Sequence, residues 1–309
     1  MNILVLNLLQ KIRNTINNYL FEDKHLGTPL FTLRIGLGII VLLQLIHLMP
    51  DAFTLIGKNG MIHQDIANIQ LPQNMISSDK LVDFLSYRFH FSEFESLYLL
   101  GWIYCISALF LIVGLFTRFS ATVCWLLHLA FVNSGHFFTY GVDYFITMLL
   151  FYCIIFPVGY EFSVDNYLFR YRHTNYTPYI RVLQIHLCIV YFVSGLAKTI
   201  GINWWNGVSI LKALCRPGIS SFHIQTFSKF SGIFVLIGVA TIILELLYVV
   251  FVNYGRTRKL WLFLTCVMHI VIAFCLQLPF FAAVMILMNV CAFYFPTRIL
   301  NSNSQNDNF

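Results

Sequence analysis

Lys198 is the residue whose type and position most directly suggest chemistry in this chain. It closes a long apolar segment, Ile180–Ala197, and the chain then turns through Gly201 to Trp204. A charged group at the end of a membrane helix is costly unless it reaches the interface, pairs with another charge or has a function. A lysine in apolar surroundings loses its proton more easily and can then act as a base. A side chain that simply reaches the interface is the alternative interpretation.

Four further ionisable side chains lie in or beside apolar segments. His136 and Asp143 flank a short connection, whereas Glu245 and His269 lie part-way along their segments. Ionisable groups inside a membrane usually face the interior of the helix bundle and mark a functional site. Structural alternatives stay open, because His269 is also typical of a histidine packed against a neighbouring helix, and Glu245 is placed to pair with Arg256.

The composition indicates a polytopic membrane protein. Hydrophobic residues make up 59% of the chain and charged residues only 10%, whereas soluble domains carry about 25% charged residues. The net charge of +6 comes from basic residues in short loops between apolar segments, so it does not indicate nucleic-acid binding. The eight cysteines form no C-x-x-C motif, so neither a redox motif nor a metal site is expected.

The apolar pattern predicts an all-α fold with about eight transmembrane helices, each roughly long enough for a hydrocarbon core of ~30 Å. The predicted spans are Phe31–Leu48, Leu97–Phe116, Ala121–Phe138, Tyr144–Val158, Ile180–Ala197, Ile233–Val252, Leu260–Leu276 and Phe280–Phe295.

Three segments differ from these spans. Residues 1–24 have apolar residues at helical spacing and predict an amphipathic helix on the membrane surface. Residues 25–297 form the transmembrane domain, and within it the acidic segment 49–96 predicts a small extracytoplasmic cap of short helices between the first two spans. Residues 298–309 form a polar tail.

The distribution of basic residues predicts the orientation in the cell (inner) membrane. Arg118, Arg170, Arg172 and Arg256 all fall on one side of the alternating spans. The positive-inside rule makes that side cytoplasmic, so both termini are expected inside, and the cap and Lys198 outside.

Four motifs in order resemble a known family. They are Leu33-Arg34-Ile35-Gly36-Leu37-Gly38, His136-Phe137-Phe138-Thr139-Tyr140-Gly141, Phe162-Ser163-Val164-Asp165, and Tyr191-Phe192 followed by Gly195-Leu196-Ala197-Lys198, Trp204 and Gly207. Over about Phe31 to Phe295 the chain resembles the transmembrane part of the vitamin K-dependent gamma-glutamyl carboxylases and their short bacterial relatives, the horizontally transferred transmembrane (HTTM) domain proteins.

The resemblance implies roles for particular residues. Lys198 falls on the catalytic base, which deprotonates a reduced quinone, and His136 and His269 fall on two functional histidines. Tyr140, Asp143, Tyr191, Trp204 and Glu245 are then expected to contact substrate. Tyr140 and Tyr191 are alternatively aromatic residues of the membrane interface.

The expected function follows from the same resemblance. It implies an integral membrane enzyme that couples oxidation of a reduced, vitamin K- or menaquinol-like quinone to modification of a peptide or small molecule at the outer face. O₂ and CO₂ are co-substrates if carboxylation is retained. The expected partners are membrane lipid, the quinone, and a secreted peptide substrate or a partner recognition protein, with no nucleic acid.

The chain departs from the carboxylases in three respects, one of which is a spacer to Trp204 that is one residue longer. It has Ala197-Lys198 where they carry two adjacent lysines, and their large lumenal domain is not expected after the last span. A transporter or channel, or a non-catalytic partner in secreted-peptide maturation or immunity, therefore remains an alternative.

Overall fold

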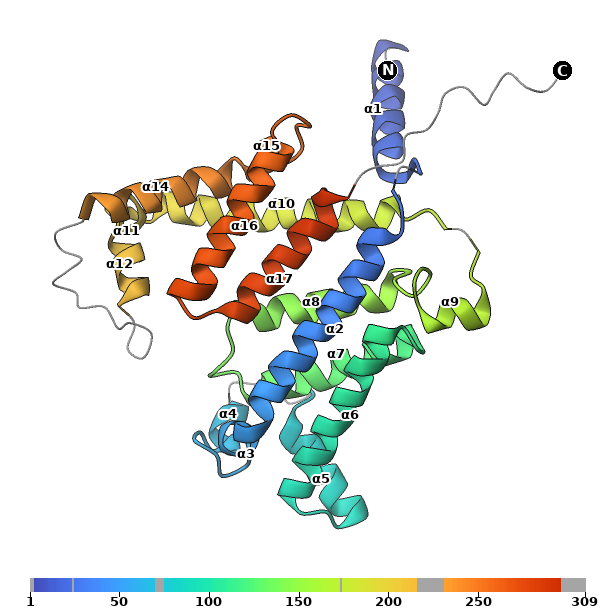
Figure 1. Ribbon diagram of the computed structural model, residues 1–309, viewed down its shortest axis with the longest axis vertical. Coiled ribbons are helices and arrows are strands. Elements are labelled where there is room, and N and C mark those ends of the chain that lie inside the picture. The colour runs from blue at the N-terminus through green and yellow to red at the C-terminus, as the bar shows by residue number, and fades with distance from the viewer. Residues whose placement is uncertain (1–2, 24, 70–74, 173, 216–230, 296–309) are drawn as a thin grey trace. The chain divides into compact units, whose positions relative to one another are not determined.

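The structure is a computed structural model that describes residues 3–23, 25–69, 75–172, 174–215 and 231–295 (Figure 1). Within these ranges all the longer secondary-structure elements are helices, which confirms the all-α prediction. The predicted polar tail, 298–309, lies outside them. The chain divides into two compact units: unit 1 contains residues 1–29 and 173–309, and unit 2 contains residues 30–172.

Four helical segments in the described part of the chain are long and apolar enough to cross a membrane. They are Thr28–Ile56, Glu93–Val113, Thr177–Ile200 and Arg258–Cys275. Three other apolar helices are shorter: Gly141–Ile155, Gly232–Leu246 and Pro279–Tyr294. The segment Thr117–Ser134 is long enough but less apolar, because it carries polar residues such as Arg118, His128 and Asn133. The structure thus supports four of the eight predicted spans.

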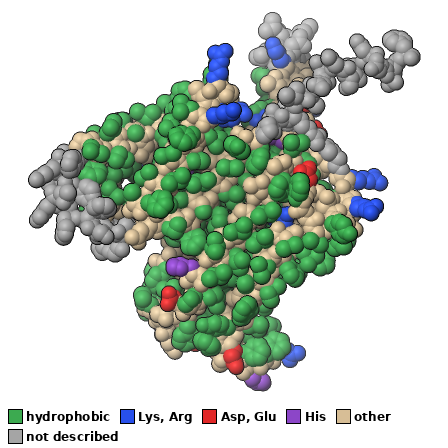
Figure 2. Space-filling model, in the orientation of Figure 1, with side chains coloured by type: hydrophobic (Ala, Val, Ile, Leu, Met, Phe, Trp, Pro, Cys, Tyr) green, Lys and Arg blue, Asp and Glu red, His purple; other side chains and the backbone are tan. Residues whose placement is uncertain are grey.

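Many large apolar side chains are exposed on these helices. Leu236 is 68% exposed, Phe263 is 64% exposed and Ile189 is 55% exposed. Figure 2 shows hydrophobic side chains over much of the visible surface, with few charged groups among them. A soluble monomer rarely exposes so much contiguous apolar surface, so these faces are suited to lipid.

Unit 2 is built from four long helices and several short ones. The long helices are α2 (Thr28–Leu48), α6 (Glu93–Val113), α7 (Thr117–Ser134) and α8 (Gly141–Ile155). The short elements are η1 (Met49–Asp51), α3 (Ala52–Ile56), α4 (Gln64–Ile69), α5 (Ser78–Phe89) and α9 (Val164–Phe169).

Local sequence explains where the helices of unit 2 begin and end. Ser92 and Glu95 form a reciprocal capping box at the start of α6, which satisfies backbone N–H groups that a helix start leaves unpaired. Gly114 ends α6 with a φ of 76°, a left-handed conformation that glycine adopts without strain.

In the segment between α2 and α6, α5 is tied to α7 because the Ser78 N–H donates to Ser134 Oγ at 2.8 Å.

Unit 1 contains α1 (Ile3–Phe21) and the longest helix, α10 (Thr177–Ile200). After α10 come α11 (Ile202–Trp205), α12 (Val208–Leu214), α14 (Ser231–Leu246), α15 (Tyr248–Phe251), α16 (Arg258–Cys275), α17 (Pro279–Asn289) and the π-helical turn η2 (Val290–Tyr294). Figure 1 shows α14 running alongside α10 within this unit. The predicted N-terminal helix is present as α1, and its place on a membrane surface stays a prediction.

One predicted span of unit 1 differs from the structure. The sequence predicts one continuous helix over Ile233–Val252, but the helix is interrupted at Leu247 and continues as α15. The Trp261 indole N–H donates to the Leu244 carbonyl at 3.0 Å. This hydrogen bond from α16 occupies a carbonyl in the last turn of α14, beside the interruption.

Candidate functional site

Lys198 and Glu245 form an ion pair inside unit 1. Lys198 Nζ, from the last turn of α10, lies 2.6 Å from Glu245 Oε2, from the end of α14. The Lys198 side chain is 16% exposed and that of Glu245 is 9% exposed. Lys198 Nζ also donates to Ser194 Oγ at 2.6 Å and lies 5.0 Å from the centre of the Trp204 ring. Glu245 therefore pairs with Lys198, and the alternative partner Arg256 is wrong.

The pair forms because α10 and α14 approach closely at Gly195. A Cβ added at Gly195 would lie 2.7 Å from the Leu246 backbone nitrogen and 3.0 Å from Leu246 Cα. Only a residue without a side chain allows this backbone approach. Gly195 is three residues before Lys198 on α10, and Leu246 directly follows Glu245, so the approach brings the two charged side chains together.

A second polar cluster lies on the same face of α10. Tyr191 precedes Lys198 by seven residues, which is about two helical turns and ~10 Å along the axis. Its hydroxyl oxygen lies 2.7 Å from His269 Nε2, on α16, and accepts a hydrogen bond from Asn289 Nδ2, on α17, at 2.8 Å. The Tyr248 hydroxyl, on α15, donates to Asn289 Oδ1 at 2.7 Å. This cluster therefore joins four helices, α10, α15, α16 and α17, through buried polar side chains.

The remaining predicted site residues belong to unit 2. His136 Nδ1 lies 3.2 Å from the Asn133 carbonyl, so Nδ1 carries the hydrogen and Nε2 is an acceptor. His136 Nε2 is buried, with no hydrogen-bond partner in the described part of the chain. His136 thus presents an unused acceptor.

Asp143 has a structural role at the start of α8. One carboxylate oxygen accepts from the Tyr140 backbone N–H at 3.0 Å, and the other accepts from Gln44 Nε2, on α2, at 2.8 Å. Its predicted contact with substrate stays a prediction. Burial, followed by the Asp143 carboxylate, raises the pKa of Tyr140 to about 12, so that hydroxyl stays protonated at neutral pH.

His128 has a structural role, because both of its ring nitrogens have hydrogen-bond partners. Its Nε2–H donates to the Asp143 carbonyl at 3.1 Å, and its Nδ1 lies 3.0 Å from the Tyr104 hydroxyl. His136 and His269 differ from His128, because each has one buried ring nitrogen without a hydrogen-bond partner among the described residues.

Two of the sequence motifs meet at the turn between α6 and α7 in unit 2. Arg34 is fully buried and donates to the carbonyls of Leu111, Ile112 and Phe162 at 2.8, 2.6 and 2.7 Å. Asp165 accepts from the Thr117 backbone N–H and hydroxyl, both at 2.7 Å. These residues close the last turn of α6 and cap the first turn of α7, so they stabilise the fold rather than forming a reaction site.

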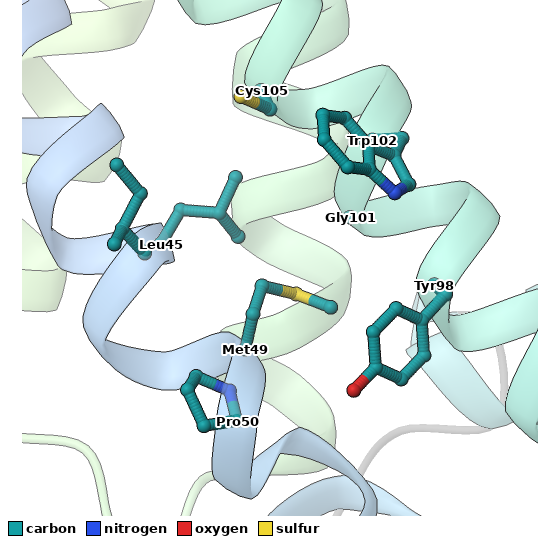
Figure 3. Close-up of a pocket in the computed structure, with 8 residues that line it drawn as sticks. Leu45, Met49, Pro50, Tyr98, Gly101, Trp102 and Cys105 are labelled. Atoms are coloured by element: carbon teal, nitrogen blue, oxygen red, sulfur yellow. The ribbon is translucent and has the colours of Figure 1, made fainter.

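An apolar groove lies in unit 2 between the end of α2 and the start of α6 (Figure 3). Its volume is about 380 Å³, and Leu45, Met49 and Pro50 face Tyr98 and Trp102 across it. Trp102 is 63% exposed. The groove suits a lipid chain, but it holds no carboxylate, lysine or histidine that could transfer protons.

Four residues of these two clusters were not identified from the sequence. Ser194 and Leu246 contact the Lys198 region of α10, and Tyr248 and Asn289 belong to the Tyr191 cluster. Asn289 offered a usable signal, because it is an amide within the apolar segment Phe280–Phe295, and polar side chains at such positions usually face other helices.

The comparisons with known proteins agree with a membrane domain. The HTTM domain family model matches residues 61–297. No curated protein and no solved structure matches the chain.

Proposed function

Because the chain belongs to the HTTM domain family, we propose that it is a membrane enzyme that uses a reduced quinone to modify a peptide or small molecule at the outer membrane face. The observation that carries this proposal is the shielded Lys198–Glu245 pair, with its Nζ–Oε2 distance of 2.6 Å. A lysine held against a carboxylate, away from bulk water, is a proton-handling pair of the kind that general acid–base catalysis uses.

The roles of the residues follow from their contacts. Lys198 Nζ can pass a proton to Glu245 Oε2, and the neutral amine then accepts a proton from an acidic hydroxyl of the substrate. Ser194 holds Nζ in place from one turn earlier on α10. Trp204 covers the ammonium with its ring and limits the access of water.

A reduced quinone is suited to this site. It is apolar enough to enter from the bilayer, it carries acidic hydroxyl groups, and with O₂ it supplies the oxidising power and the strong base that carboxylation by CO₂ requires. Its oxygens need hydrogen-bonding groups, and unit 1 offers Lys198 and the buried Nδ1 of His269, which has no partner among the residues that the structure describes. His136, Tyr140 and Asp143, in unit 2, keep their proposed roles as contacts of the substrate.

We further propose eight spans, formed by the four long apolar segments together with α7, α8, α14 with α15, and α17 with η2. The segment 49–96 then forms an extracytoplasmic cap, and both termini lie in the cytoplasm. The proposed orientation is supported by Arg118, Arg170 and Arg172, which lie at the end of unit 2 where Asp165 caps α7. If a cysteine at Asp65 reacts with an impermeant thiol reagent only after the inner membrane is permeabilised, this orientation is wrong.

The proposed activity is tested with purified protein in lipid nanodiscs, supplied with menadiol as the reduced quinone. Wild type should consume O₂ and oxidise menadiol faster than an empty nanodisc. Lys198→Ala and Lys198→Arg should both lose roughly 10²–10⁴-fold in rate, because neither side chain can act as the base. Lys212→Ala, which removes an exposed lysine from the same unit, is the matched control.

The product is tested by the mass of a co-expressed secreted peptide, with wild type and with Lys198→Ala. A gain of one carboxyl group that depends on Lys198 supports carboxylation. Menadiol oxidation at the same rate by wild type and Lys198→Arg contradicts the enzyme proposal and favours transport or a scaffolding role.

A further inference from the structure

Tyr248, Asn289, Tyr191 and His269 form a continuous chain of buried hydrogen bonds in unit 1. The three links measure 2.7, 2.8 and 2.7 Å. Tyr248 and Asn289 are fully buried, and Tyr191 and His269 are each 2% exposed. A buried polar network is destabilised when one of its members lacks a hydrogen-bond partner. The atom of this network that lacks a partner among the described residues is therefore informative.

A backbone carbonyl sets the direction of this chain. Asn289 Nδ2 donates to the Met285 carbonyl at 2.8 Å, and a carbonyl oxygen can only accept. The amide nitrogen must therefore occupy this position. Its second hydrogen points to the Tyr191 hydroxyl, and Oδ1 is left to accept from Tyr248.

The protonated nitrogen of His269 follows from that direction. The Tyr191 hydroxyl accepts from Asn289 and uses its own hydrogen to donate to His269 Nε2. Nε2 is then the acceptor of a neutral imidazole, so Nδ1 carries the hydrogen. His269 Nδ1 is buried and has no hydrogen-bond partner within the described ranges. An unpaired buried donor is destabilising, because the hydrogen bond that it loses to water is not replaced.

We propose that the Nδ1–H of His269 is a preset hydrogen-bond donor for an acceptor oxygen of the bound ligand, a carbonyl or phenolate oxygen of the quinone. Tyr191, Asn289 and Tyr248 are positioning residues that hold the imidazole in this tautomer. The identity of the ligand rests on the proposed function, whereas the tautomer does not. Tyr191, which bonds to His269, and Lys198 lie on the same face of α10, about two turns apart.

The tautomer is measured without any ligand. Protein labelled with ¹⁵N-histidine in nanodiscs gives ring nitrogen signals that show which nitrogen carries the hydrogen, and the His269→Gln variant assigns the His269 signals. Wild type should show Nδ1–H. Hydrogen on Nε2 in wild type overturns the proposal.

Two variants test the positioning residues. Asn289→Leu removes the donor to Tyr191, so the Tyr191 hydroxyl can turn and a mixture of tautomers should appear. Tyr248→Phe removes only the far end of the chain, and the Met285 carbonyl still orients Asn289, so the wild-type tautomer should persist. An unchanged tautomer in a folded Asn289→Leu protein contradicts the positioning role.

The ligand assignment is tested by the binding of menadione, whose carbonyls only accept hydrogen bonds. In His269→Asn the amide nitrogen replaces Nδ1, whereas in His269→Gln it replaces Nε2. The His269→Asn variant should therefore bind menadione with an affinity within about threefold of wild type. The His269→Gln variant should lose about tenfold in affinity, which corresponds to one hydrogen bond.

The outcomes separate this inference from the proposed function. Equal binding by the asparagine and glutamine variants overturns the donor role of Nδ1, even if wild type oxidises menadiol. Failure of wild type to bind menadione or oxidise menadiol removes the quinone from the proposal and leaves the tautomer result in place.

Discussion

Lys198 Nζ and Glu245 Oε2 lie 2.6 Å apart, although 47 residues separate them in the chain. Both side chains are largely removed from solvent. A buried charge is tolerated mainly when it is paired, and removal of one partner leaves the other uncompensated. The pair is thus both the centre of the candidate site and a constraint on the packing of α10 against α14.

A double-mutant cycle should reveal this coupling in the stability of the protein. Lys198→Met and Glu245→Leu alone should each lower the free energy of unfolding by about 3–5 kcal/mol, because each leaves a buried charge unpaired. The double variant should recover most of that loss. The measurement is thermal unfolding in one detergent, and additive losses in the double variant would show that the two charges do not interact.

Gly195→Ala should disturb the Lys198–Glu245 pair although it adds only one methyl group. The new methyl group would lie 2.7 Å from the Leu246 nitrogen, so α14 must move and the Lys198–Glu245 distance must grow. We expect loss of menadiol oxidation and a lower unfolding temperature, with a cost of about 1–3 kcal/mol for overpacking.

Gly232→Ala is the matched control, because it lies on α14 itself and has no atom within 4 Å of the added Cβ. It should leave activity unchanged and slightly stabilise the helix. Equal behaviour of the two alanine variants would contradict the close approach of α10 and α14 at Gly195.

The long helices were predictable because their apolar segments are continuous and bounded by glycine, proline or charged residues. The interruption at Leu247 was not, since no glycine or proline marks it in the sequence. A side chain from another helix, Trp261, bonds to the carbonyl of Leu244 beside it, and a contact between helices cannot be read from local pattern.

The candidate site was predictable to a similar extent. Lys198 and His269 stand out because ionisable groups are rare in apolar segments. Their partners depend on which helix faces touch, and for this reason the sequence suggested Arg256 as the partner of Glu245, whereas the structure shows Lys198. Only the structure, through the hydrogen bonds of Tyr191 and Asn289, indicates which nitrogen of His269 carries its hydrogen.

Arg34→Lys should destabilise unit 2 although the charge is retained. The guanidinium reaches three backbone carbonyls at once, and a single ammonium cannot reproduce that geometry. Loss of at least one charged hydrogen bond should cost about 1.5–3 kcal/mol. Arg118→Lys, at an exposed position of the same unit, is the control, and equal unfolding temperatures for the two variants would contradict this role.

Asp79 should make the segment between α2 and α6 sensitive to acid. Asp79 is buried and accepts hydrogen bonds from Asn68 Nδ2 at 2.8 Å and from Ser134 Oγ at 3.4 Å, so it links α4 and α5 to α7. Burial alone would raise the pKa of this carboxyl, but hydrogen bonds from Ser77, Asn68 and the backbone outweigh burial and lower the pKa below its ordinary value of 3.8.

The direction of that shift fixes the pH dependence. A carboxyl whose pKa is lower in the folded state stabilises the protein above its unfolded pKa, and this contribution is lost as the pH falls through the folded pKa. We therefore expect a constant contribution from about pH 7 down to about pH 4, and a decline below that. Asp79→Asn should be less stable than wild type at neutral pH, and the difference should shrink in acid.

Thermal unfolding of wild type and Asp79→Asn across this pH range measures the effect. Asp65→Asn is the control, since the Asp65 side chain is 89% exposed and its contact with His63 lies at the surface, so its loss should change stability little. If the difference between wild type and Asp79→Asn grows on acidification instead, the Asp79 carboxyl is protonated in the folded protein at neutral pH, and its hydrogen bonds do not hold it as an anion.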